Sequence, residues 1–402
     1  MSCLLTLGSN PQTIFLFFAH STAYMKRTLT LLILLVTLTP AIAQKKLLPG
    51  FVRRMLFDKD STRRSSFFLL PVLGSAPETG VEVGGSALYS FYTDTAHKNT
   101  RVSNIFGYAT ITTKGQERTS LSTSYWAPQN AWHYIAAVSF INFPSDFYGI
   151  GDNTLKANQD HMGQKRFKVN FEADKNLGSG IYLGVVAGGF NYSFNDKDPG
   201  GIFDTDPRVE FRNGGATAFI GPSLIYDTRN NNTYTTKGMV ITSYFNLMKG
   251  LFGNNSYQGG FFNIEYAQFF KLNKRFVLGL DIQDQNLTGA QSPFYLMPAL
   301  GSDEMMRGYY NGRYRDRNLV AGQTELRYRL SDRIGVVGFV GTGTVFNQAF
   351  SFNKLKPNYG GGLRYFFDVE KGLSVRMDYG FGEKPAGEQR QSGLYLGLGE
   401  SF

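Results

Sequence analysis

Stretches in which apolar and polar residues alternate recur along the chain from residue 66 to the C-terminus. In the clearest of them, residues 373–381, bulky apolar side chains share one face, whereas Arg376 and Asp378 lie on the other. A period of two is typical of β-strands. The pattern predicts an all-β chain with sixteen strands, at residues 66–75, 81–92, 101–113, 118–126, 132–143, 165–175, 181–194, 214–227, 238–248, 257–270, 275–285, 320–331, 334–346, 357–367, 372–382 and 392–402.

The connections between these predicted strands alternate in length. The three longest, residues 144–164, 195–213 and 286–319, all follow odd-numbered strands, and the connections after even-numbered strands are short. An even number of strands with long loops on one rim and short turns on the other is typical of outer-membrane barrels. We therefore predict a sixteen-stranded antiparallel transmembrane β-barrel, with charged side chains facing the lumen, apolar ones facing lipid, and residues 286–319 as its long outer loop.

The composition agrees with a membrane protein that crosses by strands. Glycine accounts for 46 of the 402 residues and aromatic residues for 15%. After residue 43 no apolar run reaches the ~18 residues that a membrane helix needs. The formal charge of +10 could indicate nucleic-acid binding. In a chain with this strand pattern, the basic residues are better explained by contacts in the lumen or with lipopolysaccharide, so no nucleic-acid partner is expected.

The first residues have the pattern of a secretory signal peptide at 25–43. A basic start, Met25-Lys26-Arg27, precedes an apolar run and an Ala-x-Ala cleavage site that ends at Ala43. We predict cleavage after Ala43 and export from the cytoplasm. Residues 1–24 are then either not translated, with Met25 as the true start, or an additional leader.

A basic lead, residues 44–65, separates the signal peptide from the barrel domain at residues 66–402. Part of it has the apolar spacing of a short helix, which could lie at the membrane interface or plug the barrel. The periodic part is under two turns long, so a disordered lead is the alternative that we favour.

No residue pattern indicates catalysis or a cofactor. The four histidines are scattered, no Gly-x-Ser-x-Gly run occurs, and the sole cysteine, Cys3, lies ahead of the cleavage site. Acidic residues at 196–206 could bind calcium, but their spacing is not that of a known calcium loop and solvated loop acids explain them better. We expect neither an enzyme nor a bound metal.

Three runs in the segment 301–330 carry a resemblance to a known family. They are MRGY at 306–309, GRYRD at 312–316 and QTELR at 323–327. Their order resembles the signature loop of the BamA/TamA outer-membrane barrels, also called bacterial surface antigens. The runs GPSLIYDTRNNNTYTTKG at 221–238 and FYGIGDNT at 147–154 are similar to further motifs of that family. The basic lead is too short for a folded POTRA domain, so the chain resembles a POTRA-less member.

The resemblance implies that Arg307, Gly308 and Tyr309 fold back into the lumen at the tip of the long outer loop. In the family this arginine pairs with an aspartate, and here Gly341 stands at the matching position. The candidate acceptors are therefore Asp378, which we favour, and Glu325. A solvent-exposed arginine is the alternative.

The family resemblance implies an outer-membrane role in which the barrel assists insertion or translocation of proteins or lipids. The alternative is a passive pore or a structural barrel without clients, because one fold serves both. Expected partners are outer-membrane lipids and lipopolysaccharide, a periplasmic helper or client proteins, and the barrel-assembly machinery during biogenesis. The final strand ends on an aromatic residue, Phe402, which resembles the C-terminal signal for that machinery.

Overall fold

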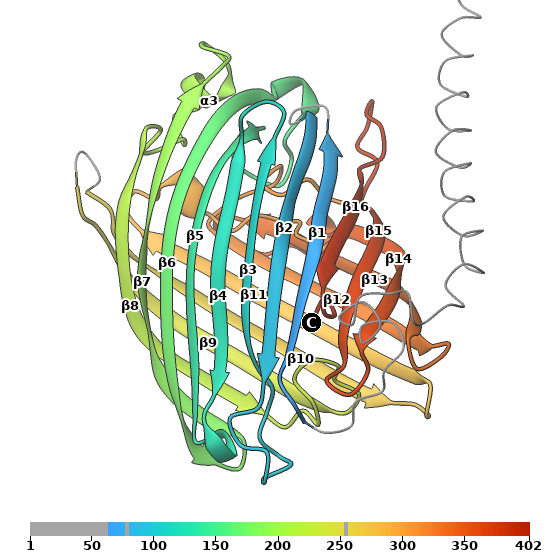
Figure 1. Ribbon diagram of the computed structural model, residues 1–402. Helices are drawn as coiled ribbons and strands as arrows, with labels where there is room; N and C mark the ends of the chain where they lie inside the picture. Colours follow the sequence, from blue (N-terminus) through green and yellow to red (C-terminus); the bar gives the residue numbers. More distant parts are fainter. Residues whose placement is uncertain (1–62, 77–79, 253–255) are drawn as a thin grey trace, which may run out of the picture. The chain divides into compact units, whose positions relative to one another are not determined.

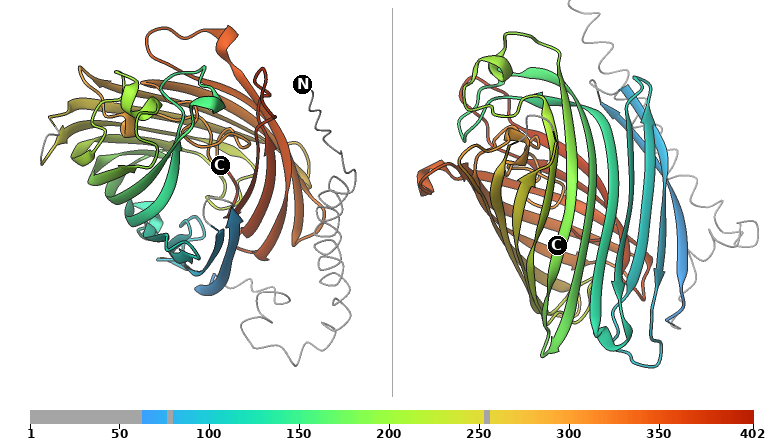
Figure 2. Two further views of the ribbon diagram at one scale, coloured as in Figure 1. Left: turned by 90° about the horizontal axis from the view of Figure 1, so that it is seen from above. Right: turned by 90° about the vertical axis from the view of Figure 1, so that its left-hand side faces the viewer.

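A single antiparallel sheet of sixteen strands curls around a central lumen in the computed structural model (Figures 1 and 2). Each strand pairs with its neighbours in sequence order, which confirms the predicted fold. The structure describes residues 63–76, 80–252 and 256–402. The strands are β1 (Ser66–Ala76), β2 (Gly80–Phe91), β3 (Ser103–Thr112), β4 (Glu117–Trp126), β5 (Trp132–Phe147), β6 (Asp160–Gly178), β7 (Ile181–Asp196), β8 (Gly214–Asp227), β9 (Gly238–Gly250), β10 (Gln258–Lys271), β11 (Phe276–Gly289), β12 (Asn318–Arg329), β13 (Ile334–Phe346), β14 (Lys356–Asp368), β15 (Leu373–Phe381) and β16 (Ser392–Leu398).

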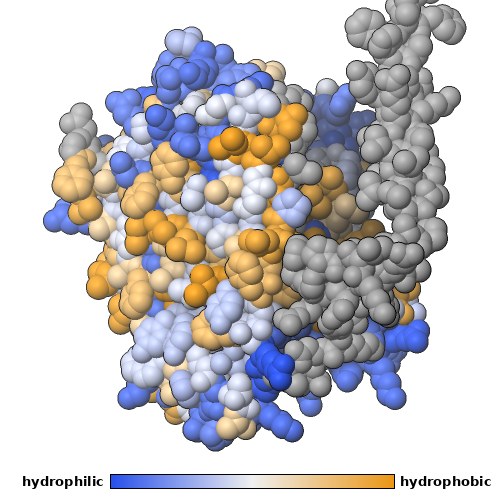
Figure 3. Space-filling model, viewed as in Figure 1, coloured by the Kyte–Doolittle hydropathy of each residue, from blue (hydrophilic) through white to orange (hydrophobic). Residues whose placement is uncertain are grey.

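The alternation along each strand separates an apolar outer face from a polar inner face. On β14 and β15, Leu363 and Met377 point outward and are 50% and 43% exposed, whereas Arg364 and Asp378 point inward and are at most 2% exposed. Figure 3 shows apolar side chains across the middle of the visible outer face and hydrophilic ones at its two ends. This distribution suits a barrel wall in lipid, where a charge near the midplane costs ~2–4 kcal/mol.

Aromatic side chains form part of a belt on the outer face of β2, β4 and β5. The rings of Tyr89 and Phe91 stack at 5.2 Å, and the belt continues through Tyr125, Tyr134 and Trp132 with ring centroids 5.7–6.3 Å apart. Tyrosine and tryptophan are enriched where a barrel wall meets the membrane surface. No helix within the described ranges has both the length and the apolar character to cross a membrane.

The two rims of the sheet differ, and we call them the loop rim and the turn rim. The loop rim, at the top of Figure 1, carries the three longest connections, residues 148–159, 197–213 and 290–317. The turn rim carries the connections that follow even-numbered strands. The short helices on the loop rim are α3 (Ile202–Thr205), η3 (Lys156–Asn158), η4 (Phe294–Leu296) and η5 (Phe352–Lys354), and η2 (Pro128–Asn130) lies on the turn rim.

A cluster of buried aromatic side chains packs together at the loop rim. The rings of Phe147, Phe203 and Phe294 lie 5.3–5.5 Å apart, and each side chain is at most 3% exposed. They come from the end of β5 and from the two connections 197–213 and 290–317. These contacts fix where the 290–317 connection enters the barrel.

Several boundaries differ from the sequence prediction, and three of the differences affect the long connections or the chain end. The β5–β6 pairing runs on to Phe147 and Asp160, so the connection between these strands is shorter than residues 144–164. The long loop occupies residues 290–317 within the predicted 286–319. The final strand ends at Leu398 rather than at residue 402. The reason is Gly399, which adopts φ +79° and turns the chain out of the strand while its N–H donates to the Ser374 carbonyl at 2.7 Å.

The predictions for the N-terminus concern residues that lie almost wholly outside the described ranges. The leader (1–24), the signal peptide (25–43) and the basic lead up to residue 62 lie outside the described residues, so these remain predictions.

Candidate functional site

The tip of the 290–317 connection lies directly against the barrel wall. Met306 and Gly308 have positive φ angles of 58° and 110°, which turn the chain sharply at the tip. A Cβ on Gly308 would lie 2.6 Å from the carbonyl carbon of Phe381, and a Cβ on Gly380 would lie 2.6 Å from that of Arg307. Only glycine at both positions lets the two backbones approach this closely.

Arg307 is completely buried at this tip and contacts two strands of the wall. Its Nη1 donates to Oδ2 of Asp378 on β15 at 2.6 Å, and its Nη2 donates to Oε2 of Glu325 on β12 at 2.9 Å. All three side chains are 0% exposed. The guanidinium carbon also lies 3.6 Å from the ring centre of Phe339 on β13, a cation–π contact. The structure thus brings together the signature arginine and both carboxylates that the sequence suggested as its acceptors.

The packing around Gly341 explains why these carboxylates replace the aspartate of the family motif. A Cβ at position 341 would lie 2.5 Å from Oδ1 of Asn358 and 2.7 Å from the carbonyl oxygen of Gly322. Asn358 in turn donates from Nδ2 to the carbonyl oxygen of Arg307 at 3.1 Å. The wall is tightly packed at this position, and the carboxylates that pair with Arg307 lie on β12 and β15 instead.

Two tyrosines hold the rest of the tip. The hydroxyl of Tyr395 on β16 accepts a hydrogen bond from the N–H of Gly308 at 2.7 Å. The Tyr309 hydroxyl donates to the carbonyl oxygen of Pro357 at 2.6 Å and accepts from the N–H of Glu383 at 2.9 Å. The three residues of the signature, Arg307, Gly308 and Tyr309, each bond to a different part of the wall or rim.

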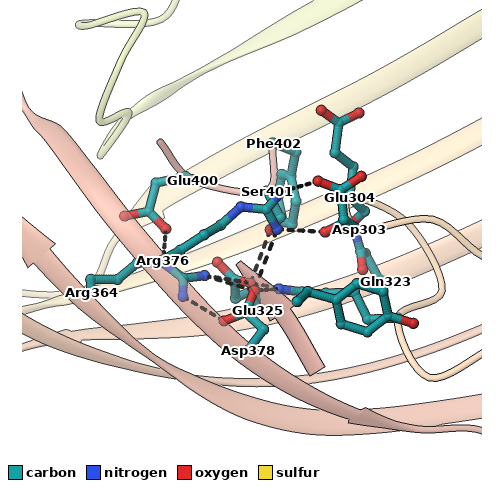
Figure 4. A network of polar contacts seen from close by, with 12 residues as sticks. Asp303, Glu304, Gln323, Glu325, Arg364, Arg376, Asp378, Glu400, Ser401 and Phe402 are labelled. Carbon is teal, nitrogen blue, oxygen red and sulfur yellow. Dashed lines mark hydrogen bonds and ion pairs between the residues drawn. The ribbon is translucent and has the colours of Figure 1, made fainter. Parts of the chain in front are cut away.

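Further inward-facing arginines extend this contact into a network (Figure 4). Arg364 donates to Oδ1 of Asp378 at 2.5 Å and to Oε2 of Glu400 at 2.8 Å. Arg376 donates to Oδ2 of Asp303 at 2.7 Å, and Arg327 donates to Oε1 of Glu325 at 2.8 Å. A buried ion needs several partners because its desolvation is costly. The mutual pairing of these ions anchors the loop and presents no activated nucleophile.

The sequence analysis did not assign Arg327, Arg364 and Glu400 to this site. The inward position of Arg327 and Arg364 follows from strand alternation, so that signal was present. Glu400 could not be found in this way because it follows the end of β16.

The last residues of the chain turn into the lumen and join the network. The hydroxyl of Ser401 donates to Oε2 of Glu325 at 3.1 Å, and Nη2 of Arg327 donates to the carbonyl oxygen of Phe402 at 2.9 Å. The Phe402 ring lies 5.7 Å from that of Phe269 on β10. The prediction that Phe402 ends the last strand is therefore wrong, because the turn at Gly399 ends the strand earlier. Its role as an assembly signal stays a prediction.

A second set of contacts holds the loop at the rim. Arg313 donates to Oε2 of Glu388 at 2.6 Å, and the N–H of Lys156 donates to its Oε1 at 2.8 Å. Desolvation alone would raise the pKa of Glu388, but these hydrogen bonds outweigh it and lower that pKa below its ordinary value. The 290–317 connection is thus tied both to the lumen wall and to its neighbours on the loop rim.

The acidic residues of the 197–213 connection pair with nearby groups. Asp198 accepts a hydrogen bond from the N–H of His161 at 2.7 Å, and Oδ2 of Asp206 accepts one from Arg208 at 2.7 Å. In the portion of the chain that the structure covers, no group of three His, Cys, Asp or Glu side chains is arranged to hold a metal ion.

Comparisons with known proteins agree with this architecture. The family model of the Omp85 superfamily domain matches residues 104–402. None of the curated proteins matches the sequence. The fold is similar to that of BamA from Haemophilus ducreyi lacking POTRA domains 1–3, with a TM-score of 0.53 and 11% identity over 84% of this chain and 70% of that one.

Two CdiB structures are also similar in fold. CdiB from Acinetobacter baumannii has a TM-score of 0.50 and 10% identity over 86% of this chain and 66% of that one. CdiB from Escherichia coli has a TM-score of 0.52 and 10% identity over 83% of this chain and 62% of that one. The chain therefore spans less than two thirds of the length of either CdiB chain. At such low identity the likeness concerns the fold alone.

Proposed function

Because this chain belongs to the Omp85 superfamily, we propose that it assists the insertion or translocation of proteins or lipids at the outer membrane. The family and the barrel fold imply a Gram-negative outer-membrane location. In this orientation the loop rim faces the outside and the turn rim faces the periplasm, as is usual for such barrels. Members of the family are insertion or transport barrels rather than enzymes, and we expect the same of this one.

The observation that carries the proposal is the seam between β1 and β16. Among the described residues, β1 pairs with β2 and β16 pairs with β15, and no strand pairing joins the two edges. The strand β16 is only seven residues long. An unpaired strand edge presents free backbone N–H and C=O groups, to which an incoming strand can add. A seam of this kind supports a role in handling client strands or lipids.

Side chains close part of the seam near the turn rim. The hydroxyl of Ser66 donates to Oδ2 of Asp368 at 3.1 Å, and the ring of Phe68 lies 4.5 Å from that of Phe367. These contacts join the start of β1 to the end of β14 rather than to β16. Side-chain contacts of this kind can separate without breaking a β-ladder, which supports a seam that opens.

A passive pore is the alternative, and the loop docked inside the lumen argues against it. The 290–317 connection enters the lumen and is anchored there by Arg307, and Phe294 of this connection packs against Phe147 and Phe203 at the loop-rim end. An open channel would need this loop to be displaced. A client-handling role needs no open channel, because the seam faces the membrane directly.

We extend the proposal to partners. Outer-membrane lipids and lipopolysaccharide would contact the apolar wall, and the barrel-assembly machinery would act during biogenesis. A periplasmic helper or client proteins would approach from the turn rim. We expect no nucleic-acid partner.

Depletion in the native host, followed by quantitative proteomics of the outer membrane, tests the proposal. We expect a defined set of outer-membrane proteins or lipids to fall, and to recover when the wild-type gene is restored. Complementation with Arg307→Ala, at a matched level of folded protein, examines whether the anchored loop contributes. An outer membrane of unchanged protein and lipid composition would contradict the proposed role and favour a structural barrel.

A further inference from the structure

The turn between β8 and β9, residues 228–237, reaches across the turn-rim mouth of the barrel. These two strands are the middle pair of the sixteen, so in the sheet they are as far as possible from both edges. Residues of the turn nevertheless contact segments next to both edges. They can do so only because the turn lies under the lumen rather than along the wall.

On one side, the turn bonds to the connection that leads into β3. Arg101 donates to Oδ2 of Asp227 at 2.7 Å, and Asn232 donates from Nδ2 to the carbonyl oxygen of Val102 at 3.1 Å. Arg229 also donates to Oδ2 of Asp227 at 2.8 Å. The Asp227 side chain is 1% exposed and that of Arg101 is 11% exposed. The two bonds to Asp227 are charge-assisted and largely shielded from solvent, so this side of the contact is strong.

On the other side, the turn contacts the hairpin of β14 and β15. The hydroxyl of Thr233 donates to the carbonyl oxygen of Lys371. The Tyr234 ring packs edge-on against Phe366 with centroids 5.0 Å apart, and Arg329 lies 4.8 Å from the centre of the same tyrosine ring. Arg329 belongs to β12, so the contact with the β14–β15 hairpin itself consists of a neutral hydrogen bond and a ring contact and is the weaker of the two.

The turn is braced internally by two asparagines. Oδ1 of Asn231 accepts hydrogen bonds from the N–H groups of Thr233 and Tyr234, at 2.7 and 3.0 Å. Oδ1 of Asn230 accepts from the N–H groups of Thr236 and Lys237, at 3.1 and 3.0 Å. A turn held in this way keeps its shape when an outside contact is lost.

We propose that residues 228–237 form a clasp that holds the two sides of the seam together at the turn rim. The clasp stays attached to the β3 side through Asp227 and releases on the β14–β15 side, where Thr233 and Tyr234 make the weaker contacts. Release frees the hairpin that carries β16 and lets the seam widen at its periplasmic end. This inference rests on the proposed function, since the clasp regulates the same seam.

Spin-label distances across the seam test the clasp without any client. Leu69 on β1 and Leu396 on β16 point outward and are 59% and 61% exposed, so nitroxides on cysteines at these positions disturb little. Cys3 is replaced by serine. In Thr233→Ala/Tyr234→Ala we expect a longer and broader distance distribution than in the wild type, measured in liposomes.

A matched control is Asn273→Ala in the turn between β10 and β11. Asn273 accepts hydrogen bonds from Arg275 and Phe276 of its own turn, so its removal weakens a turn that is not the clasp. Its distance distribution should equal that of the wild type. Circular dichroism verifies that each variant is folded. An unchanged distribution in the folded clasp variant overturns the proposal, as does an equal change in the control.

A locked variant separates this inference from the proposed function. Thr233→Cys/Lys371→Cys, oxidised to a disulfide, should slow client folding in liposomes, and reductant should restore the wild-type rate. If the wild-type protein does not accelerate client folding, the proposed function fails. The spin-label distances still show whether the clasp holds the seam together. If the wild type accelerates folding and the oxidised variant does so equally, the clasp does not regulate the seam.

Discussion

Arg307 and Asp378 are 71 positions apart in the sequence, yet Nη1 of the arginine lies 2.6 Å from Oδ2 of the aspartate, and neither side chain is exposed. The arginine belongs to the loop that enters the lumen, and the aspartate belongs to β15, the neighbour of the edge strand β16. The ion pair therefore links the position of the loop to the part of the wall beside the seam.

Removing either partner of this pair should release the loop. Breaking a buried ion pair typically costs about 3–5 kcal/mol. In Arg307→Ala or Asp378→Ala the remaining partners offset part of this cost, because Arg364 still bonds to Asp378 and Glu325 still bonds to Arg307. We expect each variant to become sensitive to protease within residues 290–317, as measured on intact cells. Because the two residues act as a unit, the double variant should be no worse than either single variant.

Arg208→Ala is the control for this comparison. Arg208 pairs with Asp206 in another outer connection, and its side chain is 59% exposed. An exposed ion pair contributes only about 0–1 kcal/mol, so protease resistance of the 290–317 connection should not change. Strictly additive effects in the Arg307 and Asp378 variants would show that the two side chains do not anchor the loop together.

Gly308→Ala should weaken loop docking because of backbone contact. The new Cβ would meet the Phe381 carbonyl carbon at 2.6 Å, and φ is +110°. Strain of this kind costs on the order of 1–3 kcal/mol. The same change at Gly338, where a Cβ meets nothing within 4 Å, is the control. We expect a lower unfolding midpoint in denaturant for Gly308→Ala than for Gly338→Ala, and equal midpoints would contradict the close approach.

An aspartate at position 341, where the family motif has one, should not pair with Arg307. In Gly341→Asp the side chain would collide with Asn358 and with the backbone oxygen of Gly322, at 2.5 and 2.7 Å from its Cβ. We expect this variant to be less stable than the wild type, and to be unable to rescue the protease sensitivity of Asp378→Ala. Rescue would mean that the wall at this position can move to accept a carboxylate.

The sequence predicted the fold well because alternation is a local signal. The inward position of Arg376 and Asp378, and the number of strands, follow from residues that are close in the sequence. The sequence analysis favoured Asp378 over Glu325 as the acceptor, although both face the lumen, and the structure shows that Arg307 contacts both. The choice depends on where strands far apart in the sequence meet, which alternation does not contain.

Two other features could not be foreseen. The inward turn of the tail depends on the conformation of Gly399, and the residues after it, Glu400 to Phe402, fall within the run that the sequence predicted as the last strand. The clasp at residues 228–237 lies within the run that resembles a family motif, but nothing in that run indicates a contact across the barrel mouth. Its reach across the barrel mouth follows from the way the sheet curls around the lumen, not from its own residues.

The contact between Arg313 and Glu388 should make loop docking sensitive to acid. Hydrogen bonds lower the folded-state pKa of Glu388, so its contribution is fully present above the ordinary carboxyl range and is lost as the pH falls through the lowered value. We expect protease cleavage of residues 290–317 to increase below the ordinary carboxyl range in the wild type. Glu388→Gln should show a smaller increase, and identical pH profiles would exclude this contribution.

The most direct test of the account is the rate at which an unfolded outer-membrane barrel becomes protease-resistant in liposomes that contain the purified protein. We predict faster folding than in protein-free liposomes. The rate should return to the protein-free value when cysteines at positions 69 and 396, on β1 and β16, are joined by a short cross-linker. A rate equal to that of protein-free liposomes, or an acceleration that persists with the two edge strands joined, would contradict a barrel that handles clients at its seam.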